Sequence, residues 1–246
     1  MRYGKIGAAL LGILLVTPIP VPAQPVSYSS SQNAMVIASA TLPSVNALPL
    51  YMRVIGGRII ENKVSGISTA SGIYYQISGT AELSIDGTTS TLHESEGIFI
   101  PGGATLTIRP LSQEPPSYLQ FLLSPIAYYD LPDMGNGNGR ELYRSSAPIP
   151  ALGEGRYIVN LKKVTLPLQA PPDPLHRRSG ASMHFVLSGF GAETINGTAQ
   201  AKGPGSLSYE PAETVYQWSN PGNLPLTYLV FNVSGEAETA IVAAAR

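Results

Sequence analysis

The sequence predicts an all-β protein built from two similar barrel or sandwich units in tandem. Three observations support this fold class. Short runs of strand-forming residues are separated by Gly and Pro, and the pattern of the first half recurs in the second. Apolar residues make up 43% of the 246 residues and charged residues only 13%. A charged share well below the usual value of about 25% indicates a chain that buries much of its surface.

The repeat has a period of 110 residues. At this offset Tyr75-Gln76-Ile77-Ser78-Gly79 aligns with Phe185-Val186-Leu187-Ser188-Gly189. Further matches at the same offset pair Ile85 with Ile195, Gly87 with Gly197, Pro101 with Pro211, Tyr118 with Tyr228 and Phe121 with Phe231. The matches share one register and fall on turn-forming and aromatic residues. They therefore predict two copies of one β unit.

Each copy is predicted to be a series of short strands joined by tight turns. Residues 81–85 and 192–195 lead into Asp86-Gly87 and Asn196-Gly197. These dipeptides favour a two-residue type I′ hairpin. Later strands are expected at 98–100, 105–109 and 118–123 in the first copy, and at 207–210, 215–219 and 228–233 in the second. Short strands with turns at this regular spacing are typical of sandwiches and barrels.

The N-terminus has the features of a secretory signal peptide. Arg2 and Lys5 precede an apolar run at 6–16, and Val21-Pro22-Ala23 places small residues at a cleavage site before Gln24. We therefore expect an exported protein, periplasmic or extracellular. The predicted organisation is a signal peptide at 1–23, an N-terminal arm at 24–46, a first barrel at 47–125, a connection at 126–156, a second barrel at 157–235 and a C-terminal tail at 236–246.

Charge and cysteine content exclude several classes of function. Fifteen Lys and Arg against sixteen Asp and Glu give a net charge of −1, without a basic block. We therefore expect no nucleic-acid partner and, after signal cleavage, no membrane partner. The absence of Cys excludes disulfides, thiolate nucleophiles and Cys-ligated metals, and leaves three His as nitrogen ligands.

The second copy resembles the cupin superfamily, and more narrowly the two-domain bicupins. The resemblance lies in residues 174–189, 205–211 and 216–222 and, together with the first copy, covers most of 47–235. It implies two tandem jelly-roll barrels, also called double-stranded β-helices, related by the 110-residue repeat. It does not define a function, because cupins include dioxygenases, isomerases, lyases, storage proteins and sensors.

The resemblance also indicates where a metal would be bound. In metal-binding cupins two His and a Glu come from the first motif and a third His from the second. Here these positions hold His176, Arg178, Ser182 and Tyr216. In the first copy they hold Gly66, Ser68, Gly72 and Leu106. Because one ligand in four is retained, we expect no cofactor and no transition metal. A metal site made of His176, His184 and Tyr216 is the alternative.

The second copy still concentrates polar side chains at positions expected to face inward. The predicted ligand-binding residues are His176, Arg178, Ser182, His184, Tyr216 and Trp218. Arg178 can hold a carboxylate through two hydrogen bonds, and His176 and Tyr216 are the candidate acid and base. Polar groups in an open barrel mouth would give the same pattern without a ligand.

The leading interpretation is an exported bicupin that binds a small polar or anionic organic ligand in its C-terminal barrel. One alternative is a cupin-type enzyme, either a metal-dependent dioxygenase or isomerase or a metal-free lyase or isomerase. The second alternative is a structural or interaction protein. A small molecule is the expected partner, and a homodimer is compatible with each of these readings.

Overall fold

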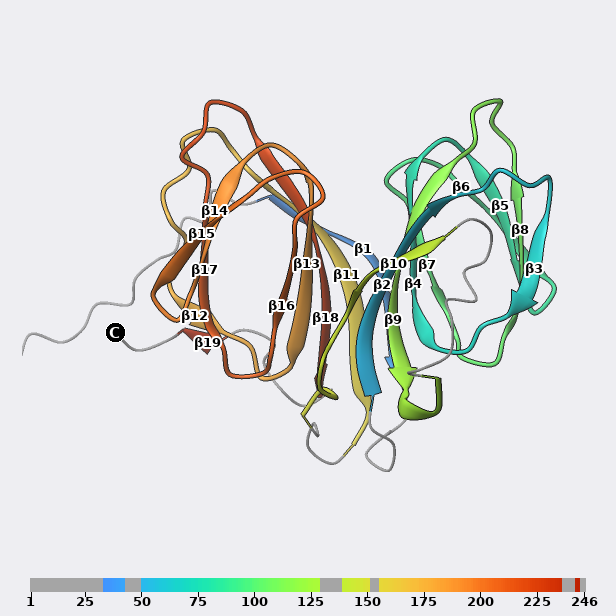
Figure 1. The fold of residues 1–246 in the computed structure, drawn as a ribbon, viewed down its shortest axis with the longest axis horizontal. Helices are drawn as coiled ribbons and strands as arrows, with labels where there is room; N and C mark the ends of the chain where they lie inside the picture. The colour runs from blue at the N-terminus through green and yellow to red at the C-terminus, as the bar shows by residue number, and fades with distance from the viewer. Residues whose placement is uncertain (1–32, 43–49, 129–138, 151–154, 236–241, 244–246) are drawn as a thin grey trace, which may run out of the picture.

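The computed structural model describes residues 33–42, 50–128, 139–150, 155–235 and 242–243. These residues form β-strands and one short 3₁₀ turn, and every strand pairing among them is antiparallel. The strands build two barrels that lie side by side (Figure 1). The predicted all-β fold of two tandem barrels is confirmed. No helix in this part of the chain is long and apolar enough to cross a bilayer.

The first barrel consists of two sheets, with strand orders β10-β2-β9-β4-β7 and β3-β8-β5-β6. Its elements are β2 (Leu50–Arg58), β3 (Val64–Ile67), β4 (Ser71–Ser78), β5 (Ala81–Ile85), β6 (Thr88–Leu92), β7 (Gly97–Ile100), β8 (Thr105–Pro110), β9 (Ser117–Pro125), the 3₁₀ turn η1 (Ile126–Tyr128) and β10 (Arg140–Arg144).

The second barrel has the sheets β1-β11-β18-β13-β16 and β15-β14-β17-β12-β19. Its strands are β1 (Asn33–Leu42), β11 (Tyr157–Leu166), β12 (His176–Arg177), β13 (Ala181–Ser188), β14 (Gly191–Ile195), β15 (Thr198–Lys202), β16 (Leu207–Glu210), β17 (Val215–Ser219), β18 (Leu226–Gly235) and β19 (Val242–Ala243). Five of them, β13 to β17, begin 110 residues after β4 to β8, as their bounds give.

The hairpins follow from their turn residues. Asp86 and Gly87 both have positive φ, of 48° and 83°, and Asn196 and Gly197 repeat this with 46° and 81°. A type I′ turn requires positive φ at both central positions, so the hairpin prediction is confirmed in both copies. The turns fix the register of β5 with β6 and of β14 with β15.

Each barrel includes one strand from outside its own segment of the sequence. β1, which comes before the first barrel, pairs with β11 of the second from Asn33↔Thr165 to Leu42↔Tyr157. β10 lies between the barrels in sequence and pairs with β2 of the first, where Arg53 Nε donates to Glu141 Oε2 at 2.6 Å. Both strands cover sheet edges that would otherwise be unpaired. They fall within the segments predicted as arm and connection.

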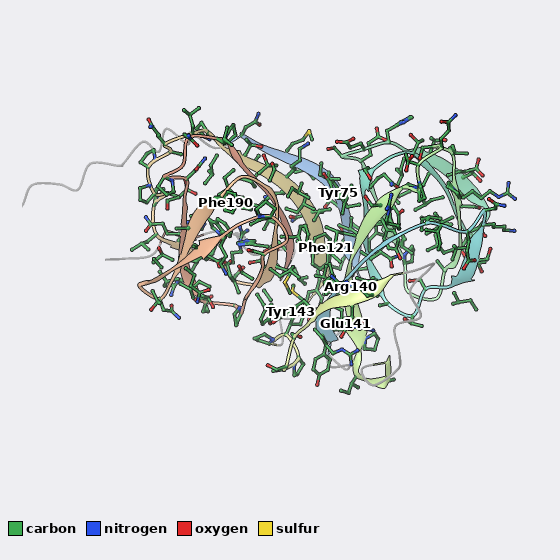
Figure 2. The ribbon with its side chains drawn as sticks, turned by 45° about the horizontal axis from the view of Figure 1, so that its top comes forward. Tyr75, Phe121, Arg140, Glu141, Tyr143 and Phe190 are labelled. Carbon is green, nitrogen blue, oxygen red and sulfur yellow. The ribbon has the colours of Figure 1, made fainter. Side chains whose placement is uncertain are left out.

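The largest hydrophobic cluster lies between the barrels, where the β2-containing sheet faces the β11-containing sheet. At its centre the rings of Phe121 and Phe231 stack with centroids 5.6 Å apart. Figure 2 shows Tyr75 and Phe121 in this region. The 110-residue offset matches these two phenylalanines, and in the structure they pack between the copies.

The predicted signal peptide at 1–23 lies outside the described residues. So do most of the tail at 236–246 and parts of the arm at 24–46 and of the connection at 126–156.

Candidate functional site

The interior of the second barrel is lined from both sheets. On β13 the side chain of Val186 belongs to the barrel core, whereas Met183 belongs to the cluster between the barrels. Because side chains alternate along a strand, Ser182 and His184 share the inward face of Val186. Trp218 of β17 belongs to the same core and closes the interior from the opposite sheet.

Three ligand-type side chains meet inside this barrel. His184, Glu193 and Glu210, from β13, β14 and β16, are all buried, and their ligand atoms lie within 4.8 Å of one another. The Nδ1 atom of His184 is 3.4 Å from Oε1 of Glu193 and 3.3 Å from Oε1 of Glu210. We call this group the acid–histidine triad.

Hydrogen bonds inside the triad are not enough to satisfy its atoms. The indole Nε1–H of Trp218 donates to His184 Nδ1 at 3.1 Å, so in this arrangement Nδ1 acts as an acceptor and has no proton for either carboxylate. Burial lowers the pKa of His184, which favours the neutral ring, although the nearby carboxylate of Glu193 opposes this. Three acceptor atoms therefore converge, and a proton or a cation between them would stabilise the arrangement.

The two carboxylates have different electrostatic surroundings. Burial, followed by the charge of Glu193, raises the pKa of Glu210 well above its usual value, although Ser182 Oγ donates to Glu210 Oε2 at 2.8 Å. Burial also acts to raise the pKa of Glu193, but its contacts with His184, Ser208 and Lys202 together lower it below its usual value. Lys202 Nζ lies 3.0 Å from Glu193 Oε2. Of the two carboxylates, Glu210 is therefore the one that holds a proton more readily.

The first barrel provides an internal control for these polar positions. At an offset of 110 residues its buried equivalents are apolar or uncharged: Gly72 for Ser182, Tyr74 for His184, Leu83 for Glu193, Leu92 for Lys202, Ile100 for Glu210, Leu106 for Tyr216 and Ile108 for Trp218. The same fold therefore forms with apolar or uncharged side chains at these positions. Because isolated buried charges are costly, packing alone does not account for the polar set.

Three of the residues predicted from sequence, His176, Arg178 and Tyr216, lie together beside the triad, and the Tyr216 and His184 ring centroids are 5.8 Å apart. The rings of His176 and Tyr216 are paired across β12 and β17, with centroids 4.1 Å apart. The guanidinium carbon of Arg178 lies 5.3 Å from the centroid of the Tyr216 ring. Arg178 is 8% exposed and Tyr216 is 1% exposed, so these polar groups do not lie in a solvent-open mouth.

His176 is partly buried and its ring has a defined orientation. Its Nδ1 lies 2.7 Å from the carbonyl oxygen of Pro174, which can only accept, so the proton is on Nδ1 and Nε2 carries the lone pair. Burial lowers the pKa of His176, and the charge of Arg178 adds to this effect. The structure thus brings His176, Arg178 and Tyr216 together, while Ser182, His184 and Trp218 adjoin the triad.

Sequence reasoning missed Glu193, Lys202 and Glu210. Glu193 was assigned to a strand before the Asn-Gly turn, and Glu210 to a strand before Pro211, without a functional role. The signal was present in the repeat, since Leu83, Leu92 and Ile100 are replaced by charged residues 110 positions later.

No family model and no curated protein sequence matched the chain. Solved structures did. A tryptophan-to-tyrosine variant of oxalate decarboxylase from Bacillus subtilis aligns with a TM-score of 0.58 and 14% identity over 79% of this chain and 71% of that chain. A Bacillus subtilis oxalate decarboxylase structure studied for its Mn(II) centers aligns with a TM-score of 0.54 and 14% identity over 85% of this chain and 78% of that one.

The expectation of a protein without a cofactor or transition metal needs correction. That expectation counted only the four positions at 176, 178, 182 and 216. The structure instead assembles one imidazole and two carboxylates elsewhere in the same barrel, and the Bacillus subtilis oxalate decarboxylase that shares the fold has Mn(II) centers. A mixed nitrogen and oxygen donor set of this kind suits Mn²⁺ or Fe²⁺.

At identities of 14% the structural matches establish the fold and nothing finer. Together with the sheet orders of the two barrels they are sufficient for that purpose. The chain has the fold of the cupin superfamily, in the form of two tandem jelly-roll barrels.

Proposed function

We propose that this protein is a bicupin whose second barrel holds a divalent transition metal at His184, Glu193 and Glu210 and binds a small anionic organic ligand beside it. One observation carries the proposal. Three ligand atoms lie within 4.8 Å of one another, fully buried, where the first barrel has Tyr74, Leu83 and Ile100. The fold does not need these groups, so a bound cation is the best account of them.

Neighbouring side chains hold the triad in place. Lys202 pairs with Oε2 of Glu193 and leaves Oε1 toward His184. Ser182 donates to Oε2 of Glu210 and likewise leaves Oε1 toward His184. Each carboxylate thus presents one oxygen, and supporting contacts of this kind tune a metal site. A bound divalent cation would supply Lewis acidity and an anchor for an anionic group.

The charges of the site favour an anionic ligand. Glu193 and Glu210, when both are ionised, contribute two negative charges, and Lys202 and Arg178 contribute two positive charges. Lys162 and Asp173 nearby add one charge of each sign, so a divalent cation in the triad leaves an excess of two positive charges. A carboxylate ligand would compensate that excess, and the Arg178 guanidinium is suited to bind it through two hydrogen bonds.

A proton-transfer enzyme is a second candidate, favoured by the orientation of His176. With Nδ1 bound to the Pro174 carbonyl, Nε2 is free to accept a proton, and the ring lies beside Tyr216. Such a pair can act as base and acid on a ligand held by Arg178. The Bacillus subtilis neighbours are oxalate decarboxylases, so oxalate is a rational first ligand to test here.

Export is part of the proposal. It is supported by the basic residues Arg2 and Lys5, the apolar run at 6–16 and the small residues before Gln24. Mass spectrometry of the mature protein should find an N-terminus at or within a few residues of Gln24. An intact Met1 on protein in the membrane fraction would contradict export.

The experiment that tests the metal site is a titration of the metal-free protein with Mn²⁺, followed by calorimetry and elemental analysis. We expect about one Mn²⁺ per chain. The double variant Glu193→Leu/Glu210→Ile, which copies Leu83 and Ile100, should bind none. A matched control, Glu82→Gln, changes a carboxylate of the first barrel and should bind like the wild type.

Two results would contradict the proposal. Equal Mn²⁺ binding by the wild type and the double variant would mean that the metal does not bind at the triad. Absence of both metal binding and oxalate binding in the folded wild type would favour the structural or interaction class.

A further inference from the structure

A row of four polar side chains crosses the inner face of the second barrel. Cross-strand registers pair Asn160 with Asn232, Asn232 with Ser182, and Ser182 with Glu210. Residues paired in this way point to the same face of a sheet. Asn232 alternates with Phe231, which belongs to the cluster between the barrels, so the row faces the interior. We call these four residues the polar row.

The amide end of the row is buried without partners. Asn232 is 1% exposed, and neither its Nδ2 nor its Oδ1 has a hydrogen-bond partner. The Oδ1 of Asn160 also lacks one. A buried amide without partners is destabilising, so a folded protein normally provides them. The missing partners therefore indicate groups that a ligand would bring.

The first barrel again shows that the fold does not require this arrangement. Its corresponding row pairs Arg53 with Leu122, Leu122 with Gly72, and Gly72 with Ile100. Three of these side chains are apolar or absent, and Arg53 forms an ion pair with Glu141 at 2.6 Å. The unpartnered amides are thus specific to the barrel that contains the acid–histidine triad.

Cationic groups adjoin the polar row. Arg178 is buried over Tyr216, and its Nε also lacks a hydrogen-bond partner. Lys162 is two residues from Asn160 on β11 and therefore shares its inward face. The charge of Arg178 acts on residues at both ends of the row. Burial lowers the pKa of Lys162, and Arg178 lowers it further. Burial raises the pKa of Glu210, and Arg178 opposes this rise.

We infer that the ligand of the second barrel is a small carboxylate that carries a hydroxyl group, with the carboxylate at Arg178 and the hydroxyl at Asn232 and Asn160. This inference rests on the proposed function, in which the barrel binds a small anion. The amide oxygens of Asn232 and Asn160 need a donor, and Asn232 Nδ2 needs an acceptor. A hydroxyl can donate its one proton to one of these oxygens and accept from Asn232 Nδ2, whereas a second carboxylate is an acceptor alone and would face two amide oxygens.

The test compares ligands that differ by one hydroxyl, using the full chain loaded with Mn²⁺. Binding of malate and succinate, and of glycolate and acetate, is measured by calorimetry. We expect the hydroxylated member of at least one pair to bind about tenfold more tightly, the effect of one well-formed hydrogen bond in a buried site. Asn232→Leu, which copies Leu122, should remove the preference and leave succinate and acetate binding within about twofold.

Mn²⁺ binding is measured in the same samples and separates this inference from the proposed function. If the wild type binds Mn²⁺ but shows no preference for a hydroxyl, or binds none of the four acids, the inference is wrong and the metal site stands. If the preference persists in Asn232→Leu, the hydroxyl is bound by the metal or by another residue. If Asn232→Leu does not fold, Asn232→Ala replaces it, and intact Mn²⁺ binding shows that the barrel is formed.

Discussion

The ammonium group of Lys202 lies 3.0 Å from Oε2 of Glu193, and both side chains are largely shielded from solvent. The residues 110 positions earlier, Leu92 and Leu83, occupy buried apolar positions in the first barrel. The two barrels therefore offer two solutions for the same pair of positions. One is an ion pair that holds a triad carboxylate, and the other is a hydrophobic contact within a core.

This comparison predicts a specific pattern of stability in the metal-free protein. Lys202→Leu and Glu193→Leu should each lower the free energy of unfolding by about 3 kcal/mol, because each leaves a shielded charge unpaired. The double variant, which copies Leu92 and Leu83, should regain most of the loss. Denaturant unfolding of all four proteins checks this. If the double variant loses as much free energy of unfolding as the two single variants together, Lys202 and Glu193 do not stabilise each other.

Local sequence patterns predicted much of the fold. Asp86-Gly87 and Asn196-Gly197 define their hairpins by backbone preference alone, so they could be identified without the structure. β1 and β10 were not foreseen as barrel strands. Their partners lie far away in sequence, as in Asn33↔Thr165, and nothing in a short edge strand specifies such a distant partner.

The site was predicted in part. The period-two alternation from Ser182 placed His184 inside, and the structure buries it. Glu193 and Glu210 lie on strands of five and four residues, where one shift in phase moves a side chain from the interior to the surface. The repeat shows that both side chains face the interior, because the equivalent residues Leu83 and Ile100 are apolar. The metal-capable group was therefore recognisable only by comparing the copies residue by residue.

The affinity for a divalent cation should depend on pH through Glu210. Burial and then the charge of Glu193 raise its pKa, so the folded metal-free protein keeps a proton there that the cation must displace. Mn²⁺ affinity should rise with pH by up to about tenfold per unit, and level off above the raised pKa. Calorimetry in buffers of different ionisation enthalpy counts the protons released.

The raised pKa of Glu210 should make the metal-free protein less stable as the pH rises. A carboxyl whose pKa is raised on folding binds its proton more tightly in the folded state, so its contribution is complete below the pKa of the unfolded chain. Stability should therefore fall as pH rises from about 4.5 through the raised pKa, and Glu210→Gln should reduce this loss. A Mn²⁺ affinity that does not change with pH, with no proton released on binding, would contradict the assignment of the proton to Glu210.

The hydrophobic cluster between the two barrels should contribute strongly to the stability of the protein. Truncating Phe231 or Phe121 to Ala should each cost about 3–5 kcal/mol, because both rings are fully buried in the central cluster. A double-mutant cycle should give a coupling of about 0.5–1.5 kcal/mol for the stacked rings. Phe190→Ala is the matched control: this ring is 70% exposed, and its loss should change stability by less than about 0.5 kcal/mol. Zero coupling would mean that the barrels pack without this stack.

Trp218 should report occupation of the triad. It is the single tryptophan of the chain, its ring stacks on Tyr228 with centroids 4.4 Å apart, and its indole N–H donates to His184 Nδ1. A cation bound through that nitrogen uses the lone pair that now accepts the indole proton, so metal binding should break this hydrogen bond. Titration with Mn²⁺ or Co²⁺ should therefore change the intensity and maximum of Trp218 emission, with a midpoint equal to the calorimetric one.

Two controls decide whether this signal comes from the triad. Mg²⁺, which prefers an all-oxygen site and retains its water ligands, should give a much smaller change at equal concentration. Glu193→Leu/Glu210→Ile should abolish the response to Mn²⁺ while Trp218 stays buried, as an emission maximum near that of the metal-free wild type would show. If Trp218 emission does not change in a wild-type sample that calorimetry shows to be saturated, the cation does not use Nδ1 of His184. The ligand nitrogen would then be Nε2, which has no hydrogen-bond partner of its own.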